Sequence, residues 1–274
     1  MNGPVSPTVG VVVPLYNSAA TIAETLDSIL QQTHRALDIV VVDDGSTDHG
    51  PELVRQRMAA EPRLRLIHQP NSGVAAARNH GAAVASGEFL AFVDADDLWA
   101  PDKIERQVRA LQQGGPAASF AYCWTATIDA ASAILTLDQR PSFDGQVLRE
   151  LCAHNFVGNG SSMLVRRSLF DAIGGFDTGL RAQGAEGCED YLFCLEAAER
   201  AQFRVVPRFL LGYRQLPTSM ARNGPRYTSY PTADRFVEAF DADAYKSWVA
   251  RRNIGGIRRA LSLYVHLPFC STIC

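Results

Sequence analysis

The chain has 274 residues, of which 47% are hydrophobic and 20% charged, and its formal net charge is −3 at pH 7. This composition is typical of a folded globular protein, and the small negative charge gives no basic field that would indicate nucleic-acid binding. No apolar run approaches the roughly 18 residues of a membrane helix, and residues 1–8 lack a signal-peptide pattern. We therefore expect a cytoplasmic protein with one large domain or two modest ones.

The first 115 residues alternate short apolar runs with stretches of helical apolar spacing. The expected strands are residues 9–14, 37–42, 64–67 and 89–93. The expected helices are residues 19–32, 51–60, 74–85 and 101–113. Continuous apolar strands separated by helices predict a parallel sheet that is covered on both faces. In such sheets, ligands bind beyond the carboxyl ends of the strands.

The pattern becomes less regular after residue 115. We expect a strand at residues 118–127, glycine-rich loops at residues 158–162 and 174–187, and a helix at residues 190–200. No internal repeat is visible along the chain, so a repeat architecture is not expected.

Three of the expected strands run into polar clusters. Residues 16–17 (YN) follow the first strand, residues 43–48 (DDGSTD) the second, and residues 94–97 (DADD) the fourth. In an extended chain, residues two apart point the same way, so Asp94 and Asp96 can face one ligand. Two carboxylates suit Mg²⁺ or Mn²⁺, which keeps open positions for phosphate oxygens.

Each acidic cluster also has a plainer interpretation. Residues 94–97 could form a solvated turn in which Asp97 caps the following helix. Residues 43–48 could form a strand-to-helix turn, or they could accept hydrogen bonds from a nucleobase N–H or a ribose hydroxyl. Neither a dinucleotide-binding GxGxxG after the first strand nor a complete P-loop is present.

Three motifs in this order resemble the nucleotide-sugar domain of the family 2 glycosyltransferases, which have the GT-A fold. They are PLYN at residues 14–17, VVDDGSTD at residues 41–48 and GVAAARNHGAAVASGEFLAFVDADD at residues 73–97. In the second half, residues 158–180 resemble the acceptor-side segment, residues 189–191 the ED motif, and residues 212–214 with 219–220 the closing loop. The resemblance covers about residues 8–222 and implies a Rossmann-like α/β fold, a mostly parallel sheet flanked by helices.

We expect this domain to span residues 1–222, and the resemblance divides it into a nucleotide-sugar half at about residues 8–115 and an acceptor half at about residues 116–222. It implies that Tyr16 and Asp44, with Asp43 beside it, hold the nucleobase. The same nucleotide-sugar motifs also contain Pro14, Asn17 and Arg78, with Arg78 near the base or the diphosphate.

The resemblance further implies that Asp94 contacts the ribose or the metal, that Asp96 ligates Mg²⁺ or Mn²⁺, and that Asp190 is the general base. The implied acceptor-side or closing-loop residues are Glu189, Tyr213 and Arg214. A single base suits an inverting displacement, in which a positioned carboxylate contributes about 10²–10⁴-fold to the rate.

We therefore expect an inverting, metal-dependent glycosyltransferase that uses a UDP-, GDP- or dTDP-linked sugar and an acceptor hydroxyl on a glycan, a lipid-linked glycan or another molecule. Synthesis of a cell-surface polysaccharide or glycoconjugate follows from the resemblance, as does peripheral attachment to the inner face of the membrane. The alternative is a catalytically incomplete nucleotide-sugar-binding domain left by a gene fusion or truncation.

The charge balance changes near residue 223. Residues 1–223 hold 19 Lys and Arg against 25 Asp and Glu, whereas residues 224–274 hold 7 against 4. This change indicates a boundary, and we expect residues 223–274 to form a short C-terminal tail that is not homologous to the domain before it.

The tail resembles a second family. Residues 224–231 (GPRYTSYP) and 261–274 (LSLYVHLPFCSTIC) are similar to the start of oxygen-independent coproporphyrinogen III oxidase, a radical S-adenosylmethionine enzyme. Cys270 and Cys274 match the first two of the three thiolates that bind the iron–sulfur cluster in that family, and the third thiolate is absent. We interpret the tail as an incomplete fragment from a gene fusion or misjoin and expect no stable iron–sulfur cluster.

Overall fold

The computed structural model describes residues 6–137, 140–183, 185 and 187–216. The predicted boundary at residue 223, the closing-loop residues 219–220 and the vestigial cluster ligands Cys270 and Cys274 lie outside the described residues. These expectations therefore stay predictions.

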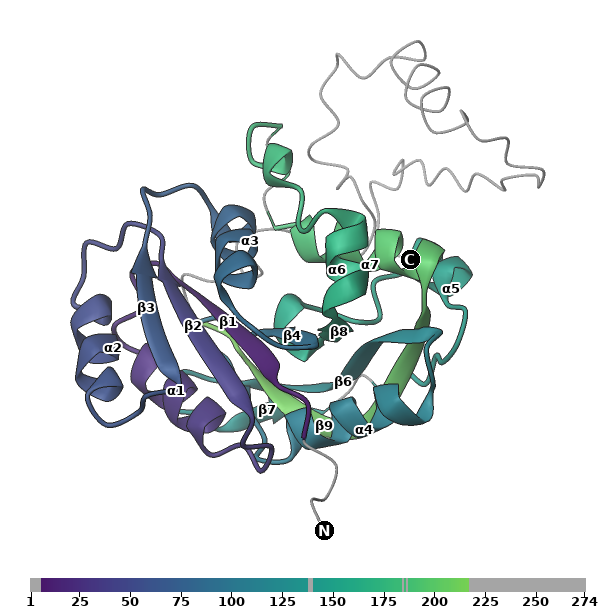
Figure 1. Cartoon of the computed structure of the whole chain (residues 1–274), viewed down its shortest axis with the longest axis horizontal. Helices are drawn as coiled ribbons and strands as arrows, with labels where there is room; N and C mark the ends of the chain where they lie inside the picture. Colours follow the sequence, from purple (N-terminus) through teal and green to yellow (C-terminus); the bar gives the residue numbers. More distant parts are fainter. Residues whose placement is uncertain (1–5, 138–139, 184, 186, 217–274) are drawn as a thin grey trace, which may run out of the picture. The chain divides into compact units, whose positions relative to one another are not determined.

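A nine-stranded sheet forms the centre of the described part of the chain, in the order β3-β2-β1-β4-β8-β6-β9-β5, with β7 paired to β6 (Figure 1). The strands are β1 (Val9–Leu15), β2 (Leu37–Asp43), β3 (Leu64–His68), β4 (Phe89–Phe92), β5 (Leu98–Trp99), β6 (Ala118–Ile128), β7 (Ile134–Thr136), β8 (Leu164–Arg166) and β9 (Gln202–Arg214). Only β5, β7 and β8 run antiparallel to their described neighbours. The expected mostly parallel α/β sheet is confirmed.

Helices cover both faces of this sheet (Figure 1). They are α1 (Ile22–Leu30), α2 (Gly50–Met58), α3 (Val74–Val84), α4 (Lys103–Gln113), α5 (Leu148–Ala153), α6 (Arg167–Ile173) and α7 (Glu189–Arg200). Among the described residues, no helix is long and apolar enough to cross a bilayer.

The core consists of two apolar layers because alternate residues of each strand point to opposite faces. Val11 and Val13 of β1 pack in one layer with α1, α2 and α4, whereas Val12 packs in the other with α3, α5, α6 and α7. Every residue of β1 is buried, which explains why this strand reads as a continuous apolar run rather than an alternating one.

The observed elements follow the expected ones closely up to residue 128, with ends that differ by a few residues. The sequence interpretation missed the strands β5, β7, β8 and β9 and the helices α5 and α6. A three-residue strand such as β8 carries almost no periodic signal. Within β9, Pro207 suggests a break, but the sheet accommodates it in a bulge, since Val206 pairs with Cys123 and Phe209 with Trp124.

Helix α3 lies unusually close to the sheet at Gly81. A β-carbon at this position would lie 2.3 Å from Val12 Cγ1 and 3.0 Å from Val42 Cγ2. We expect Gly81→Ala to destabilise the protein by about 1–2 kcal/mol, because overpacking outweighs the helix propensity gained by alanine. Urea denaturation would measure the change, with Ala83→Val on the exposed side of α3 as the matched control. A Gly81→Ala variant as stable as the wild type would contradict this close packing.

Candidate functional site

The predicted polar clusters meet at one edge of the sheet. Strands β2 and β4 both run parallel to β1, with Leu15 opposite Asp43 and Val12 opposite Phe92. The carboxyl ends of these three strands therefore bring residues 16–17, 43–48 and 94–97 to the same edge, as the sequence predicts.

Asn17 ties the first two clusters together. Its Oδ1 accepts hydrogen bonds from the backbone N–H of Thr47 (2.8 Å) and Asp48 (3.3 Å), and its own N–H donates to Ser46 Oγ (3.1 Å). Asn17 has a φ of 48°, in the left-handed region that asparagine tolerates better than most residues. Its role in this structure is to hold the two loops in register.

Pro14 and Tyr16 have different environments on either side of this turn. Pro14 is buried in β1 opposite Val42, so it shapes the strand end. The side chain of Tyr16 is 52% exposed at the rim, where a planar ligand could contact it.

Asp44 is buried and accepts three hydrogen bonds. They come from the backbone N–H of Ser72 (2.8 Å) and Gly73 (2.9 Å) and from the side-chain amide of Gln69 (2.8 Å). A carboxylate has about four lone-pair positions, so one position on Asp44 remains for a ligand. Asp44 thus also anchors the loop that leads into α3.

Asp43 is buried beside Asp44. Its carboxylate accepts a hydrogen bond from the Ser46 N–H (2.9 Å) and contacts His68 Nδ1 (2.8 Å). Burial is the largest single effect on this group and favours its neutral form, but the hydrogen bonds from Ser46 and His68 together lower the pKa of Asp43. Asp43 is therefore held as a carboxylate, and its hydrogen bonds with the Ser46 N–H, the Ser46 side chain and His68 leave about one lone-pair position.

Arg78, on α3, lies between the predicted metal site and the predicted base. The residue is 4% exposed, and its Nη2 donates to Asp94 Oδ1 at 2.6 Å. The guanidinium carbon lies 5.3 Å from the centroid of the Phe176 ring. On Gly160, a β-carbon would lie 3.0 Å from Nη2, so this glycine leaves the room that the guanidinium occupies.

The charge of Arg78 is balanced by three acids. Burial, the largest effect, disfavours the charged guanidinium, but Asp94, Asp190 and Glu189 more than offset it and raise the pKa of Arg78. Glu189 is itself buried. Arg78 thus connects Asp94, just beyond β4, with the ED motif at the start of α7.

Asp190 carries a perturbed carboxyl group. Burial raises the pKa of Asp190 to about 6, with further increases from the charges of Glu189 and Asp94, while Arg78 opposes the shift. The backbone N–H of Tyr191 donates to Asp190 Oδ1 at 2.7 Å and fixes one oxygen. A carboxyl group with this pKa is ionised at neutral pH yet remains a useful base.

Asp96 and Asp97 follow Asp94 in the acidic cluster. Burial, followed by the charge of Asp94, raises the pKa of Asp96 to about 6. Asp97 is fully buried, and burial raises its pKa well above the usual range. The suggestion that Asp97 caps the next helix is wrong, because Asp97 precedes β5 and the residue before α4 is Asp102.

The residues fit a divalent cation only in part. Among the described residues, no group of three or more His, Cys, Asp and Glu side chains is arranged to hold a metal. Burial, and after it the charge of Asp94, nevertheless raises the pKa of Asp96, and a cation beside both acids would offset the repulsion between them. Such a donor set suits Mg²⁺ or Mn²⁺ shared with the phosphate oxygens of a ligand.

Tyr213 and Arg214, predicted as acceptor-side or closing-loop residues, lie at the end of strand β9, and their role toward the acceptor stays a prediction. Arg214 is 1% exposed. Its backbone N–H donates to Asp97 Oδ1, and its guanidinium binds Glu24, Ser132 and backbone carbonyls. Through its bonds to Asp97 and to the Asp96 carbonyl, Arg214 therefore holds the loop of residues 94–97 in place. Burial, then the charges of Asp97 and its neighbours, raises the pKa of Tyr213, which places this phenol near the acids.

Sequence reasoning missed Ser161 as a residue of this site. Ser161 is fully buried, and its hydroxyl accepts a hydrogen bond from the Asp94 N–H at 3.0 Å. The glycine-rich segment at residues 158–162 was recognised, but its spacing does not show that it packs under residues 94–97.

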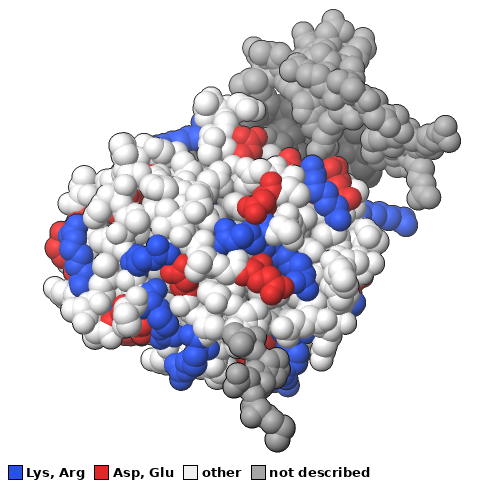
Figure 2. All heavy atoms as spheres, in the orientation of Figure 1, with Lys and Arg blue, Asp and Glu red and all other residues white. Residues whose placement is uncertain are grey.

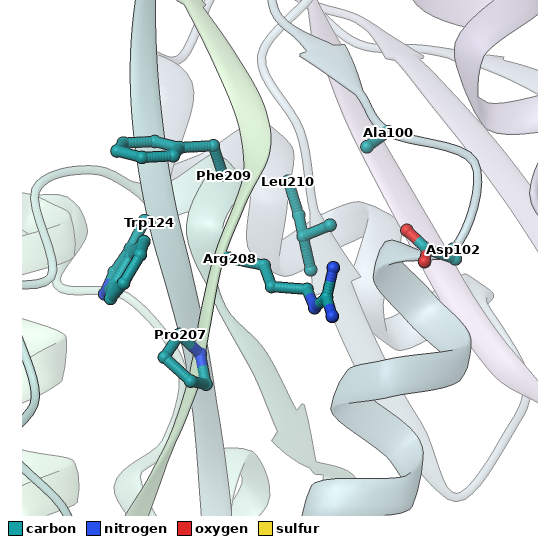
Figure 3. Close-up of a pocket in the computed structure, with 7 residues that line it drawn as sticks. All are labelled: Ala100, Asp102, Trp124, Pro207, Arg208, Phe209 and Leu210. Carbon is teal, nitrogen blue, oxygen red and sulfur yellow. The ribbon is translucent and has the colours of Figure 1, made fainter. Parts of the chain in front are cut away.

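A hollow lies away from this site, beside β9 (Figure 3). Its volume is about 580 Å³, and it is lined by Ala100, Asp102, Trp124, Pro207, Arg208, Phe209 and Leu210. Trp124 and Phe209 lie on one side of the strand, whereas Arg208 extends on the other side toward Asp102 (Figure 3). None of the predicted site residues lines this hollow.

Basic and acidic side chains are interspersed on the face shown in Figure 2. The described part of that face shows no extended patch of one sign.

The comparisons with known proteins agree with this geometry. Residues 10–174 match the family described as Glycosyl transferase family 2. Among curated relatives, the glycosyltransferase GlyG of Streptococcus pneumoniae is 41% identical over 106 residues, which cover 38% of this chain and 35% of GlyG. The chain spans about half or less of the length of the curated relatives it matches.

Two solved structures are similar in fold. S. aureus TarS 1–349 in complex with UDP-GlcNAc has a TM-score of 0.65 at 20% identity, covering 80% of this chain and 61% of that chain. The mannosyltransferase PcManGT from Pyrobaculum calidifontis in complex with GDP-Man and Mn²⁺ has a TM-score of 0.57 at 26% identity, covering 76% and 56%. The expected GT-A fold is confirmed.

Proposed function

The chain belongs to glycosyl transferase family 2, and we propose that it transfers a sugar from a nucleoside-diphosphate sugar to an acceptor hydroxyl with inversion. The observation that carries this proposal is the position of Arg78, one buried cation that joins Asp94 to the neighbourhood of Asp190. It supports a donor diphosphate and a base that face each other across one site.

In this proposal, Asp190 takes the proton of the acceptor hydroxyl while that oxygen attacks the anomeric carbon. The bond from the anomeric carbon to the diphosphate oxygen breaks on the opposite side, and the nucleoside diphosphate leaves with the bonding electrons. One displacement inverts the anomeric centre. The pKa of about 6 keeps Asp190 ionised at neutral pH, as the proton transfer requires.

Asp94 and Asp96 would hold Mg²⁺ or Mn²⁺, which when bound neutralises charge on the departing diphosphate. Asp43 and Asp44 would accept hydrogen bonds from the nucleobase, with Tyr16 at the rim beside it. TarS with UDP-GlcNAc and PcManGT with GDP-Man and Mn²⁺ support this class of donor. For the acceptor, we propose a hydroxyl of a glycan or a lipid-linked glycan.

A thermal-shift screen of UDP, GDP, dTDP and their sugar conjugates, with and without Mn²⁺, tests the donor site. A ligand that binds only the folded state stabilises it by mass action, and this stabilisation raises Tm. At a ligand concentration of 100 times Kd, the free energy of unfolding increases by about 2.7 kcal/mol. We expect at least one nucleotide to raise Tm only with Mn²⁺, and Asp96→Ala to abolish that shift. Asp171→Ala, an exposed acid on α6, is the matched control.

Two outcomes would argue against this function. If no nucleotide stabilises the wild-type protein, the donor site is wrong. If a nucleotide sugar binds but neither transfer nor slow donor hydrolysis is detected across a panel of acceptors, the alternative of an incomplete binding domain is favoured.

A further inference from the structure

The two adjacent acids at the end of β2 are each held by a hydrogen-bonded chain that ends in a basic side chain. In the first chain, Arg55 Nη2 lies 3.1 Å from His68 Nε2, and His68 Nδ1 lies 2.8 Å from Asp43 Oδ2. A guanidinium can only donate, so Nε2 of His68 must accept. A ring hydrogen therefore lies on Nδ1 and points at Asp43.

The second chain reaches Asp44 through an amide. Gln69 Nε2 lies 2.8 Å from Asp44 Oδ1, and His80 Nδ1 lies 2.8 Å from Gln69 Oε1. The Asp44 carboxylate already accepts two backbone N–H groups, so the Gln69 amide nitrogen must face it. The Gln69 oxygen then faces His80, whose Nδ1 donates.

Both chains are local to the predicted nucleoside end of the site. His68 is the last residue of β3 and lies opposite Asp43 in the sheet register, while His80 is exposed on α3. None of these side chains belongs to the apolar core. Their contacts restrict the two carboxylates, so that the remaining lone pairs keep a fixed direction.

We infer that His68 and the Gln69–His80 pair are positioning residues for the nucleoside of the donor. By holding the carboxylates of Asp43 and Asp44 in one orientation, these residues determine which nucleobase N–H groups can donate hydrogen bonds to the two acids. This inference rests on the proposed function, because it assumes that the two acids meet the donor.

The test compares His68→Phe, which removes the donor to Asp43, with His68→Asn, whose amide N–H can replace Nδ1–H. Isothermal titration with UDP and with GDP, each with Mn²⁺, measures Kd for the full chain. We expect His68→Phe to raise Kd about tenfold, the usual effect of losing one hydrogen bond to a charged group. His68→Asn should recover most of that loss, and KM should rise more than kcat falls.

The second chain gives an independent variant. Gln69→Glu keeps the shape of the side chain but places an oxygen against Asp44, so we expect at least a tenfold rise in Kd. His49→Phe, at an exposed histidine with no contact to either acid, is the matched control and should leave Kd unchanged. Circular dichroism and Tm confirm that each variant is folded at the titration temperature.

The outcomes separate the two proposals. If the wild type binds neither nucleotide, the proposed function fails and this inference fails with it. If the wild type binds and His68→Phe and Gln69→Glu bind equally well, the inference alone is overturned. It is also overturned if His68→Asn binds as weakly as His68→Phe, because the Nδ1–H donor is then not what matters.

Discussion

Replacing Arg78 with methionine is expected to remove most nucleotide binding and transfer, with a fall of at least about 100-fold in kcat/KM, which corresponds to about 2.7 kcal/mol. The guanidinium is buried between Phe176 and Gly160, and it balances the charges of Asp94 and Asp190. Without it, the two acids repel each other and any bound diphosphate loses a neighbouring cation.

The same substitution should also lower stability. Removing one partner of a buried ion pair costs about 3–5 kcal/mol, and because Asp94 is partly exposed we expect about 3 kcal/mol. Urea denaturation measures this loss, and titration with the nucleotide found in the screen measures binding. Arg109→Met is the control, since Arg109 and Glu105 form an ion pair that is exposed on both sides, and surface pairs contribute about 1 kcal/mol or less.

Gly160→Ala gives a milder version of the same experiment. The added methyl group would lie 3.0 Å from Arg78 Nη2 and 3.2 Å from Cζ, so the guanidinium or the loop at Gly160 must shift slightly, which would disturb the contact of Arg78 with Asp94. We expect weaker nucleotide binding with little loss of stability. If Arg78→Met binds nucleotide with wild-type affinity, the bridging role of Arg78 is wrong, whatever Gly160→Ala does.

Sequence reasoning was most successful where a single strand end determines the position of a residue. The clusters at residues 16–17, 43–48 and 94–97 follow three strands whose apolar runs are plain in the sequence, so a parallel sheet had to place them at one edge. Their assignment to nucleobase, metal and ribose came from the family resemblance, and those individual roles stay predictions.

The failures share a physical cause, which is dependence on partners far away in the chain. The guanidinium of Arg214 binds Glu24, 190 positions away in the chain, and no local sequence pattern predicts that contact. Ser161 supports Asp94 across 67 positions in the same way. The sequence interpretation of Asp97 as a helix cap failed in the same way. Asp97 is buried against β9, from whose Arg214 N–H it accepts a hydrogen bond, and the sequence interpretation did not anticipate that strand.

The pH dependence of transfer should report the environment of Asp190. Because the pKa of Asp190 is raised to about 6, we expect kcat/KM to fall about tenfold per pH unit below 6 and to level off above it. The charge of Arg78 lowers the pKa of Asp190. In Arg78→Lys, any displacement of the cation should therefore raise that pKa and move the acidic side of the pH profile to higher pH. Nucleotide affinity must be measured at each pH, because the pKa of Asp96 is also raised to about 6.

Asp190→Asn is expected to lower transfer by about 10³-fold or more while nucleotide affinity stays within about threefold of the wild type. Amide and carboxylate have the same shape, so the variant removes the base and leaves the site in place. Steady-state rates and titration with the nucleotide separate the two effects. Glu189→Gln, the neighbouring acid, is the matched control and should retain far more activity, because only Asp190 is assigned the proton.

Stability provides the independent readout for this variant. Burial makes the ionised form of Asp190 unfavourable in the folded state, so its contribution to stability is greatest below about pH 4 and declines as pH rises toward 6. At pH 7.5 the rise of this pKa from 3.8 to about 6 corresponds to a net cost of about 3 kcal/mol, in which the attraction to Arg78 is already included, and Asp190→Asn removes this cost. We therefore expect the Tm of Asp190→Asn to equal or exceed that of the wild type at pH 7.5 and to lose the advantage at pH 4. A variant that loses transfer together with nucleotide binding would show instead that Asp190 acts in donor binding and not as the base.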